Sequence, residues 1–448
     1  MLAQVSRASG CCSSQALVIR FSAPLKRERR VQSNGSRRSR RYHRSAASPA
    51  HPDRRRPAAT VSLPALLYIE TLPDTETLPG FTIFARASQG MWEQPTMTDT
   101  KPVRLGMIGS GFMGLTYSEA IVSQVTGAEL AAVAGGRRAA ALAADYDVPS
   151  EPDVDALLAR TDVDGVVLAT PDQDRREITE KAAAAGKHVL AEKPMAPTIA
   201  DCDAMIAACD SAGVNLAVVK TERFRKITMK AKALIDEGVI GPIRMMRTVS
   251  AFPLSTTREL FDDRQWMFDQ AGGGLFMGMA SHNTDFLRWL TGREATRVFA
   301  QATTFSDLAA PNLSVMAQIE FEEGIQAHMW ITAELPSPSL PSSEVRFQVF
   351  GRDAMFDLEN FEFLELGQGE SWERIYEPER FDYLKEPKSP IRLFPHTGVV
   401  QEFVDSIREQ RPPAVGGVEG RKAVEICEAC LRSAQTGTAV DLPLSASP

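Results

Sequence analysis

Hydrophobic and polar positions change their pattern near residue 221 of the chain. Before that point, short apolar runs predict buried strands over Val103–Ile108, Ala128–Ala134, Gly165–Ala169, His188–Ala191 and Asn215–Val219. Between these runs, residues of helical period predict helices over Leu115–Val125, Ala139–Tyr146, Arg175–Ala185 and Ile199–Ala212. Strands that alternate with helices at this spacing predict a doubly wound parallel sheet of the Rossmann type over residues 102–220.

After residue 221 the strands follow one another through short turns such as Glu322-Glu323-Gly324. Strand-like runs cover Ile243–Ser250, Arg297–Thr304, Leu313–Phe321, Ile325–Thr332, Val345–Phe350 and Phe361–Leu366. Helical patterns cover Thr228–Glu237, Ser281–Leu290, Val399–Glu409 and Glu419–Ala434. We therefore expect a second, α+β domain over residues 221–442 with an open, mainly antiparallel sheet. Its two closing helices can pack back on the first domain.

Residues 1–96 show neither pattern. They hold 15 Lys and Arg against 6 Asp and Glu, mixed with Ser, Pro and Ala, so we expect no folded core there. The apolar run at residues 16–19 is too short for a secretory signal, whereas the Arg and Ser content suits an organellar transit peptide. A third interpretation, which we favour, places the true start at Met97, shortly before the first strand.

Charge and cysteine content narrow the class of protein. The net charge of the whole chain is −7, so the part after residue 96 carries about −16, which argues against a nucleic-acid partner. No apolar run is long enough to predict a membrane span. Six cysteines are too few for a disulfide scaffold, and the C-x-x-C pair Cys427 and Cys430 fits thiols packed in a helix better than a metal or redox site. We therefore expect a cytoplasmic protein without a metal site.

The first predicted strand ends in a glycine-rich turn, Gly109-Ser-Gly111-Phe112-Met113-Gly114. Gly109 would permit a tight turn, Gly111 the close approach of a pyrophosphate, and Gly114 the close packing of a helix on the strand. The phosphates would lie at the helix N-terminus, where unpaired N–H groups and the helix dipole favour anions. We interpret the turn as part of a dinucleotide site. The alternative is an ordinary strand-to-helix loop.

The second predicted strand ends in Gly135-Gly136-Arg137-Arg138, without an acidic residue. An Asp or Glu at this place would bind the ribose 2′-hydroxyl of NAD, whereas an arginine accommodates the 2′-phosphate of NADP. Arg137 and Arg138 therefore favour NADP over NAD as the cofactor. The alternative is that both arginines only solvate the start of a helix.

Further motifs stand at the ends of the next strands. Thr170-Pro171 follows the third strand, and Ala185-Gly-Lys-His-Val leads through the fourth strand to Glu192-Lys193-Pro194. A lysine at the end of a buried strand is unusual for packing alone, because burying it costs free energy unless it is paired. Together with the glycine turn, Arg223-Phe224 and the run from Gly272 to His282 and Asp285, these motifs make residues 103–442 resemble the Gfo/Idh/MocA family of NAD(P)-dependent oxidoreductases.

The resemblance implies that the protein oxidises a secondary hydroxyl of a sugar, inositol, glycoside or related polyol, or runs the reverse reduction. It implies that Lys193 lies beside the nicotinamide and the reacting hydroxyl as general base or proton relay, because burial and the positive nicotinamide both disfavour its charge. The alternative for Lys193 is a structural ion pair with Glu192. The implied cofactor contacts are Gly109, Gly111, Phe112, Met113, Gly114, Gly136, Arg137, Arg138, Thr170, Pro171, Glu192 and Lys193. Since the open sheet of the family often makes subunit contacts, we also expect a homodimer or homotetramer.

His282 is the second acid/base candidate, because unperturbed imidazole titrates near neutrality and this residue follows a glycine-rich turn at an expected helix start. Asp285, three residues later, would orient His282 or shape the pocket. Arg223 and His396 are further expected substrate contacts. For His396, which precedes the predicted closing helix, a position in a surface loop is an equally good interpretation.

The chain departs from the family pattern at several positions. Many family dehydrogenases carry an Asp four residues before the histidine, where this chain has Gly278, and Ala280 replaces a usual glycine. Arg175 stands in place of a usual histidine, and Thr221 in place of a common asparagine. Without the aspartate, three alternatives stay open: His282 acts with Lys193 alone, Asp285 substitutes for the aspartate, or the enzyme acts on an unusual substrate. Two alternative functions stay open: tightly bound NAD recycled during glycoside cleavage, elimination or intramolecular redox, and a catalytically inactive cofactor-sensing protein.

Overall fold

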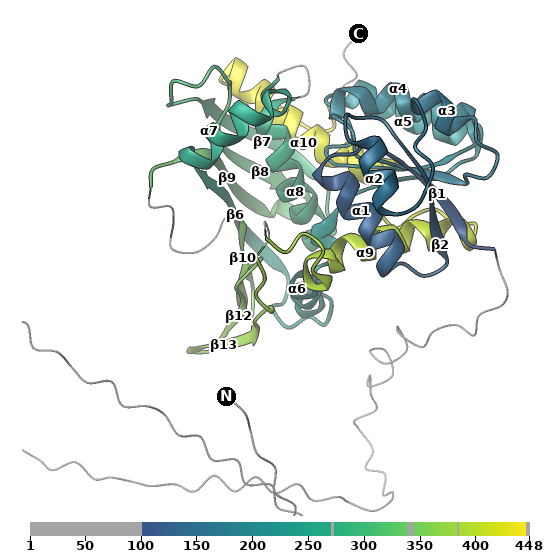
Figure 1. Cartoon of the computed structure of the whole chain (residues 1–448). Coiled ribbons are helices and arrows are strands. Elements are labelled where there is room, and N and C mark those ends of the chain that lie inside the picture. Colours follow the sequence, from purple (N-terminus) through teal and green to yellow (C-terminus); the bar gives the residue numbers. More distant parts are fainter. Residues whose placement is uncertain (1–100, 270–272, 338–339, 341–344, 383–384, 445–448) are drawn as a thin grey trace, which may run out of the picture. The chain divides into compact units, whose positions relative to one another are not determined.

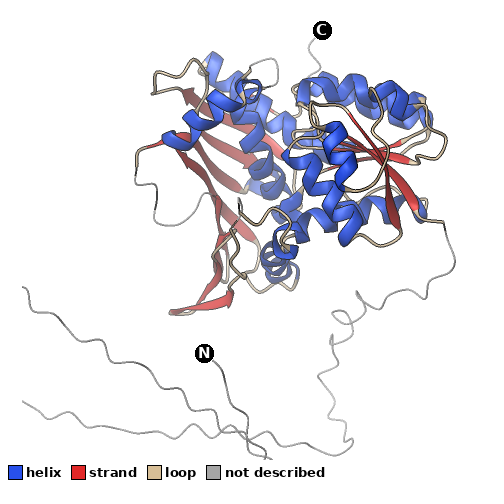
Figure 2. Cartoon of the chain, viewed as in Figure 1, coloured by secondary structure: helices blue, strands red, loops and turns tan. Residues whose placement is uncertain are grey.

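The structure, a computed structural model, describes residues 101–269, 273–337, 340, 345–382 and 385–444. These residues form two β-sheets with helices packed around them (Figures 1 and 2). The predictions for residues 1–96 and for a start at Met97 lie outside the described residues.

The first sheet is parallel and has five strands in the order β2-β1-β3-β4-β5. Its strands are β1 (Val103–Ile108), β2 (Ala128–Ala134), β3 (Gly165–Leu168), β4 (His188–Ala191) and β5 (Leu216–Val218). The helices that connect them are α1 (Phe112–Ser123), α2 (Ala139–Asp145), α3 (Val154–Leu158), α4 (Arg175–Ala184) and α5 (Ile199–Ala212). The predicted Rossmann sheet is thus confirmed. Only the short α3 was not predicted, because five residues are too few to show a helical period.

The strand order determines where this sheet can bind a ligand. From β1 the chain passes to β2 on one side and then crosses back to β3 on the other side of β1. Open parallel sheets bind ligands in the crevice outside the carboxyl ends of the strands at such a reversal. The glycine turn after β1 and Thr170-Pro171 after β3 both lie there.

The second sheet has nine strands in the order β13-β12-β11-β10-β6-β9-β8-β7-β14. They are β6 (Ile243–Pro253), β7 (Ala295–Thr303), β8 (Ser314–Phe321), β9 (Gln326–Leu335), β10 (Val345–Gly351), β11 (Met355–Glu359), β12 (Phe363–Gln368), β13 (Ser371–Tyr376) and β14 (Val440–Asp441). The expected mainly antiparallel sheet is confirmed. The exception is the pair β6 and β9, which is parallel and was not predicted from the short turns. The strands β11, β13 and β14 were not predicted, because β13 is mostly exposed and the other two are short.

The helices of the second half are α6 (Lys226–Asp236), α7 (Leu254–Asp263), α8 (Gly274–Thr291), α9 (Pro390–Arg408) and α10 (Gly417–Thr436). The helix α7 was not predicted, and α8 and α9 begin well before their predicted starts at Ser281 and Val399. Glycine disfavours helix, so Gly274 and Gly278 obscured the first turns of α8. Pro390 and Pro395 concealed the start of α9 in the same way, because proline usually breaks a helix. Pro390 is tolerated because it is the first residue of the helix. Consequently His282 lies in the middle of α8 rather than at its start, and His396 lies inside α9 rather than before it.

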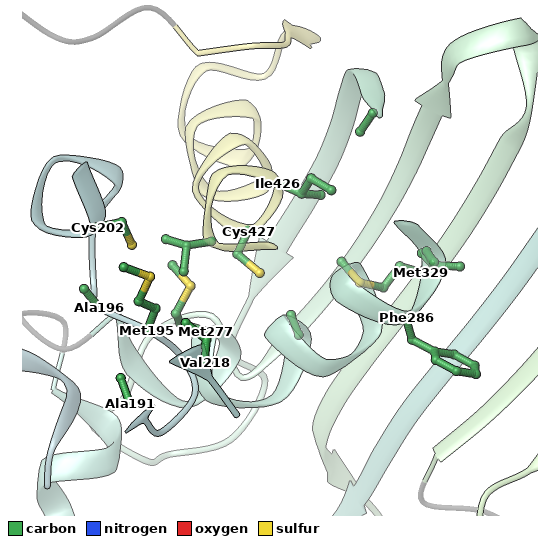
Figure 3. Close-up of a cluster of buried hydrophobic side chains, with 14 of the residues drawn as sticks. Ala191, Met195, Ala196, Cys202, Val218, Met277, Phe286, Met329, Ile426 and Cys427 are labelled. Atoms are coloured by element: carbon green, nitrogen blue, oxygen red, sulfur yellow. The ribbon is translucent and has the colours of Figure 1, made fainter. Parts of the chain in front are cut away.

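The hydrophobic core runs without a break from one sheet to the other. Figure 3 shows Met195 and Val218 of the Rossmann half close to Met277 of α8 and Cys427 of α10, with Phe286 and Met329 continuing toward the second sheet. On the other face of the five-stranded sheet, Val400 and Phe403 of α9 join the core formed by β1. The last two long helices therefore cover the Rossmann sheet from both sides, and they fix the position of the second half against it.

Candidate active site

A long cleft opens at the carboxyl ends of the parallel strands and continues between the two halves. Residues from both halves line it, and most of the predicted site residues are among them. From the Rossmann half these are Gly109, Gly111, Phe112, Met113, Gly136, Arg137, Arg138, Thr170, Pro171, Glu192 and Lys193, and from the second half His282 and His396.

The glycine turn has the close contacts that a dinucleotide site requires. Gly109 has φ of +110°, and a Cβ there would lie 2.5 Å from the carbonyl oxygen of Ala169. A Cβ at Gly114 would lie 2.1 Å from the carbonyl oxygen of Gly109, so only glycine allows α1 to start this close to β1. Gly111, the N-cap of α1, lines the cleft, and a Cβ built on it would meet no atom nearer than a guanidinium nitrogen of Arg138 at 3.9 Å. These residues fit a pyrophosphate held by the backbone N–H groups at the start of α1.

Arg137 and Arg138 lie at the end of β2, where both are exposed and line the cleft. The backbone N–H of Arg138 donates to Ser110 Oγ at 3.1 Å, which joins this loop to the glycine turn. Gly136, with φ of +79°, makes the approach possible, because a Cβ there would lie 2.6 Å from the same hydroxyl oxygen. Arg138 therefore stands beside the glycine turn, and Arg137 is its neighbour in the lining of the cleft.

The segment Glu192–Pro194 follows β4 and is held by buried hydrogen bonds. Tyr117 Oη donates to one carboxylate oxygen of Glu192, and the N–H of Lys193 donates to the other at 2.7 Å. Arg175 donates to the carbonyl oxygens of Thr170 at 2.7 Å and Glu192 at 2.9 Å, and also to that of Pro194. This buried arginine, which replaces the usual histidine, joins the loop after β3 to the loop that carries Lys193.

The ammonium group of Lys193 donates to the carbonyl oxygen of Gly278 on α8 at 3.2 Å. The carboxylate of Glu192, the partner in the alternative interpretation, instead accepts from Tyr117 and from the backbone. Burial is the main cause that lowers the pKa of Lys193 from its ordinary value. A lowered pKa favours the neutral amine, which is the form that accepts a proton from a hydroxyl group.

His282 lies one helical turn after Gly278 on the same face of α8, so it stands beside Lys193 in the cleft. Its Nδ1 atom is buried and has no hydrogen-bond partner among the described residues. Burial, together with the positive charges of Lys193 and Lys220, holds the pKa of His282 well below its ordinary value. The imidazole is therefore neutral near pH 7, which is the form that can accept a proton.

His396 reaches the same part of the cleft from α9. Its ring packs edge-on against Tyr117 with 5.7 Å between the ring centres, and 6% of the residue is exposed. Burial is the main cause that lowers its pKa to about 3. The interpretation of His396 as a surface-loop residue is therefore wrong, and the structure places it as a neutral side chain in the cleft wall.

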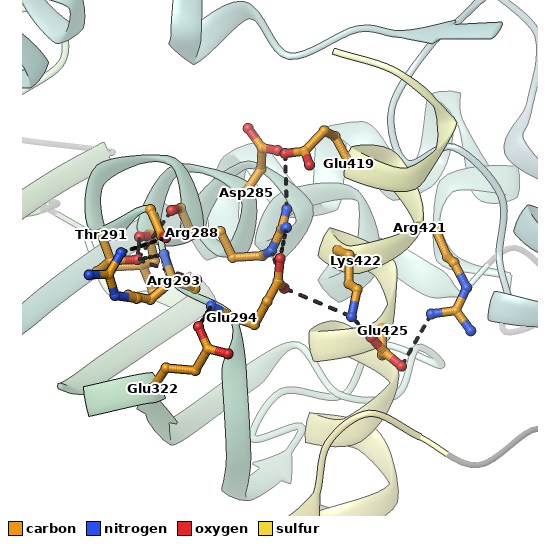
Figure 4. A network of polar contacts seen from close by, with 12 residues as sticks. Asp285, Arg288, Thr291, Arg293, Glu294, Glu322, Glu419, Arg421, Lys422 and Glu425 are labelled. Atoms are coloured by element: carbon orange, nitrogen blue, oxygen red, sulfur yellow. Dashed lines mark hydrogen bonds and ion pairs between the residues drawn. The ribbon is translucent and has the colours of Figure 1, made fainter. Parts of the chain in front are cut away.

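Arg223 and Asp285 lie outside the cleft lining, contrary to their prediction as substrate contacts. The Arg223 guanidinium donates to both carboxylate oxygens of Asp285, at 2.9 and 2.8 Å, and to Glu419 of α10 at 2.7 Å. Figure 4 shows Asp285 and Glu419 side by side, with Arg288 also bound to Glu419. Both residues are engaged in this buried network because their side chains face α10 rather than the cleft.

Sequence reasoning missed one group of cleft residues. Glu222 is 6% exposed and lies in the short 3₁₀ helix η2 (Thr221–Phe224) that follows β5. Its Oε2 atom accepts from Nε of Arg225 at 3.1 Å and from Nδ2 of Asn360 at 2.6 Å. Its Oε1 atom lies 3.9 Å from Nδ1 of His282. The only available signal was the position of Glu222 next to Arg223-Phe224, and nothing in the sequence linked it to Asn360 or His282.

Comparison with known proteins identifies the family. The model described as "Oxidoreductase family, NAD-binding Rossmann fold" matches residues 103–220, and the "GFO/IDH/MocA C-terminal domain" model matches residues 228–357. The chain belongs to the Gfo/Idh/MocA family of oxidoreductases. The prediction of a nicotinamide-dependent oxidoreductase is thus confirmed, because the matching model describes an NAD-binding family. The preference for NADP stays a prediction.

Similar proteins of the Gfo/Idh/MocA family align with this chain over almost their full length. An inositol 2-dehydrogenase of Rhizobium meliloti is 26% identical over an alignment of 339 residues, and the match covers 74% of this chain and 96% of the relative. The crystal structure of an aldose-aldose oxidoreductase from Caulobacter crescentus with glycerol has a TM-score of 0.65 and 26% identity, covering 76% of this chain and 100% of that one. The WlbA dehydrogenase of Bordetella pertussis, with NADH and UDP-GlcNAcA, has a TM-score of 0.67 and 26% identity over 78% of this chain and 100% of that one.

Across the described ranges, no three His, Cys, Asp or Glu side chains are grouped so that they could hold a metal ion. Among the helices of those same ranges, none is both long enough and apolar enough to span a membrane.

Replacing Gly109 by alanine tests the fit of the dinucleotide to the turn. We expect Gly109→Ala to weaken NAD(H) and NADP(H) binding by at least about tenfold, because the new methyl group moves the turn away from Ala169. The matched control is Gly186→Ala, which also has positive φ (+68°) but open space around the Cβ position. Fluorescence titration with the reduced cofactors gives both affinities. Equal binding by the two variants would contradict the assignment of the turn.

Proposed function

We propose that the protein transfers hydride between the C4 atom of a nicotinamide cofactor and the carbinol carbon of a sugar, inositol or related polyol. The observation that carries this proposal is the position of Lys193 and His282, which stand side by side at one end of the dinucleotide cleft. The named activities of the relatives, an inositol dehydrogenase and an aldose oxidoreductase among them, support a polyhydroxylated substrate.

The chain's own residues supply proton transfer and orientation. When bound, the cofactor supplies the hydride acceptor or donor. Removing a hydride from carbon leaves the hydroxyl oxygen to form a carbonyl, so its proton must pass to a base. Lys193, whose pKa is lowered by burial, and neutral His282 are the two groups positioned to take it.

The second half of the chain lines the cleft with polar and aromatic side chains that suit a polyhydroxylated substrate. The Oδ1 atom of Asn360 is buried and has no partner in the described part of the chain, so it can accept a hydrogen bond from a substrate hydroxyl. Trp266, 46% exposed, lines the same cleft and offers an aromatic face to the C–H groups of a sugar ring. Arg264 adds a donor at the mouth of the cleft.

We further propose that NADP is the preferred cofactor. Arg137 and Arg138 supply two positive charges at the end of β2, where the 2′-substituent of the adenosine ribose is recognised in Rossmann domains. A 2′-phosphate would receive charge-assisted hydrogen bonds from these groups. The 2′-hydroxyl of NAD carries no charge for them to pair with.

A homo-oligomer is proposed through the open face of the nine-stranded sheet. Apolar side chains on neighbouring strands of this sheet are exposed: Met245 by 58% on β6, Met316 by 52% on β8 and Phe299 by 39% on β7. Trp330 of β9 pairs in register with Met316. Such grouped apolar exposure marks an interaction surface.

The proposed location of the protein is the cytoplasm. The described cysteines Cys202, Cys209, Cys427 and Cys430 are all buried free thiols. Burial raises the pKa of Cys202, Cys209 and Cys427 to about 12, so these thiols are poor nucleophiles and metal ligands. Such a set suits a reducing compartment.

Lys193→Ala tests the proposed chemistry. We expect kcat to fall by about 100-fold or more, the usual contribution of general acid–base catalysis, while the cofactor stays bound. The control is Lys101→Ala, an exposed lysine before β1. The assay screens inositols and aldoses with both cofactors and follows the absorbance of the reduced nicotinamide. Unchanged turnover with bound cofactor would contradict the role of Lys193, and product without net reduced cofactor would favour recycling of a retained NAD.

Arg138→Ala tests the cofactor preference. We expect the Kd for NADPH to rise by about tenfold through loss of a charge-assisted hydrogen bond, while the Kd for NADH stays nearly constant. Arg176→Ala, an exposed position on α4 outside the cleft lining, is the matched control. Tighter binding of NADH than of NADPH by the unmodified protein would overturn the preference.

Met316→Glu tests the proposed oligomer face. A charge in the middle of an apolar contact costs free energy unless it is paired, so we expect the variant to have a smaller mass in solution by light scattering. Val122→Glu, a similarly exposed apolar position on α1, should leave the mass unchanged. A monomeric unmodified protein would contradict the proposed assembly.

A further inference from the structure

The helix that carries His282 has no carboxylate at the position where the family pattern places one. Gly278 stands there, four residues earlier, and a Cβ built on it would meet no described atom within 4 Å. The position opens into the cleft beside the ammonium group of Lys193, which is bound to the Gly278 carbonyl oxygen. A partner for His282 must therefore come from another element.

The other carboxylates predicted around this site are already engaged. Asp285 accepts two hydrogen bonds from Arg223 and faces α10. Glu192 accepts from Tyr117 and from the backbone N–H of Lys193. Neither is available to hold the imidazole.

Glu222 comes from η2 and faces His282 from across the cleft. Its Oε1 atom is 3.9 Å from the His282 Nδ1 atom, which is buried and without a hydrogen-bond partner in the described residues. A shift of about 1 Å would close this gap to a hydrogen bond. Asn360 and Arg225 bind the Oε2 atom, so they hold the carboxylate with Oε1 toward the ring.

We infer that Glu222 is the positioning residue for His282 and does from η2 what the family aspartate does from α8. The inference rests on the proposed function and deepens it. A hydrogen bond from Nδ1–H to the carboxylate fixes the imidazole tautomer, so that Nε2 is the free acceptor. In the oxidation direction, Nε2 would accept the hydroxyl proton as the carbonyl bond forms, and a bound nicotinamide cofactor would supply the hydride acceptor.

Charge supports the same assignment. Four groups near His282 are positively charged when protonated: Lys193, Lys220, Arg225 and His396. Their charges disfavour the protonated, positively charged form of the imidazole. The carboxylate of Glu222 offsets this effect, as a carboxylate does beside a catalytic histidine.

Glu222→Gln separates a positioning role from a structural one. The two donors Asn360 and Arg225 would hold the amide oxygen of the new side chain, which turns its NH₂ group toward His282. Nδ1 would then accept a hydrogen bond and the proton would move to Nε2, the wrong tautomer for a base. We expect ¹⁵N NMR of the imidazole, assigned by comparison with His282→Asn, to show protonated Nδ1 in the unmodified protein and protonated Nε2 in the variant.

The NMR measurement needs no turnover, so its result is independent of the substrate. The same tautomer in both proteins would overturn the inference, whatever the activity. A change of tautomer in a protein that oxidises no polyol would support Glu222 as the partner of His282 and would contradict the proposed function alone. Glu237→Gln, at the exposed end of α6, is the matched control and should leave the tautomer unchanged.

Kinetics provide the second readout. We expect Glu222→Gln to lower kcat by at least about tenfold with a nearly constant KM for the cofactor, and Glu222→Asp, which keeps the charge, to retain more activity. The double variant Glu222→Gln with Gly278→Asp places a carboxylate back on α8 in open space and should recover part of the loss. Full activity of Glu222→Gln, or equal losses in the Gln and Asp variants, would overturn the inference.

Discussion

Three buried cations join the end of the Rossmann sheet to one side of α8, and the geometry of the site depends on them. They stand after β4 and β5 and bind successive positions along the helix: Lys193 to the carbonyl oxygen of Gly278, Lys220 to that of Ser281, and Arg223 to the carboxylate of Asp285. A buried cation without a partner is costly, so α8 cannot slide or rotate without losing these contacts. The contacts of Lys220 and Arg223, which are not reacting groups, therefore help to set the distance between Lys193 and His282. The apolar core shown in Figure 3 also holds α8 in place.

At two of the positions where the chain departs from the family pattern, residues close by compensate for the change. Arg175 is longer than the histidine that it replaces, and its five N–H donors reach three carbonyl oxygens on two loops. The loop after β3 and the loop bearing Lys193 are thus fixed to each other by one side chain. The loss of the aspartate at Gly278 leaves open space instead, and the nearest carboxylate to the imidazole comes from a different element. In the first place the substituted side chain itself connects the two loops, and in the second the nearest carboxylate belongs to a residue outside the family motif.

Local sequence signals predicted the Rossmann half and its ligand loops, because each strand, turn and cap there depends on residues close in the chain. The same reasoning failed where a side chain's direction depends on distant packing. Asp285 is three residues from His282, and only the position of α10 turns it away from the cleft toward Arg223 and Glu419. The contact between Glu222 and Asn360 joins residues 138 positions apart, and no periodicity in the chain indicates it. Gly278 and Pro395 also delayed the predicted helix starts, since helix propensity is weaker than tertiary packing.

The order of the strands gives the proposed cofactor a direction. Arg137 and Arg138 follow β2, the glycine turn follows β1, and Lys193 follows β4, which is two strands from β1 across β3. Neighbouring strands lie about 4.8 Å apart, so Lys193 stands roughly 10 Å from the turn along the sheet edge. A dinucleotide with its pyrophosphate on α1 would have its adenosine toward the two arginines and its nicotinamide toward Lys193. The reverse orientation would place the nicotinamide beside exposed arginines, away from both proton-transfer candidates, so only the first orientation is consistent with the proposed chemistry.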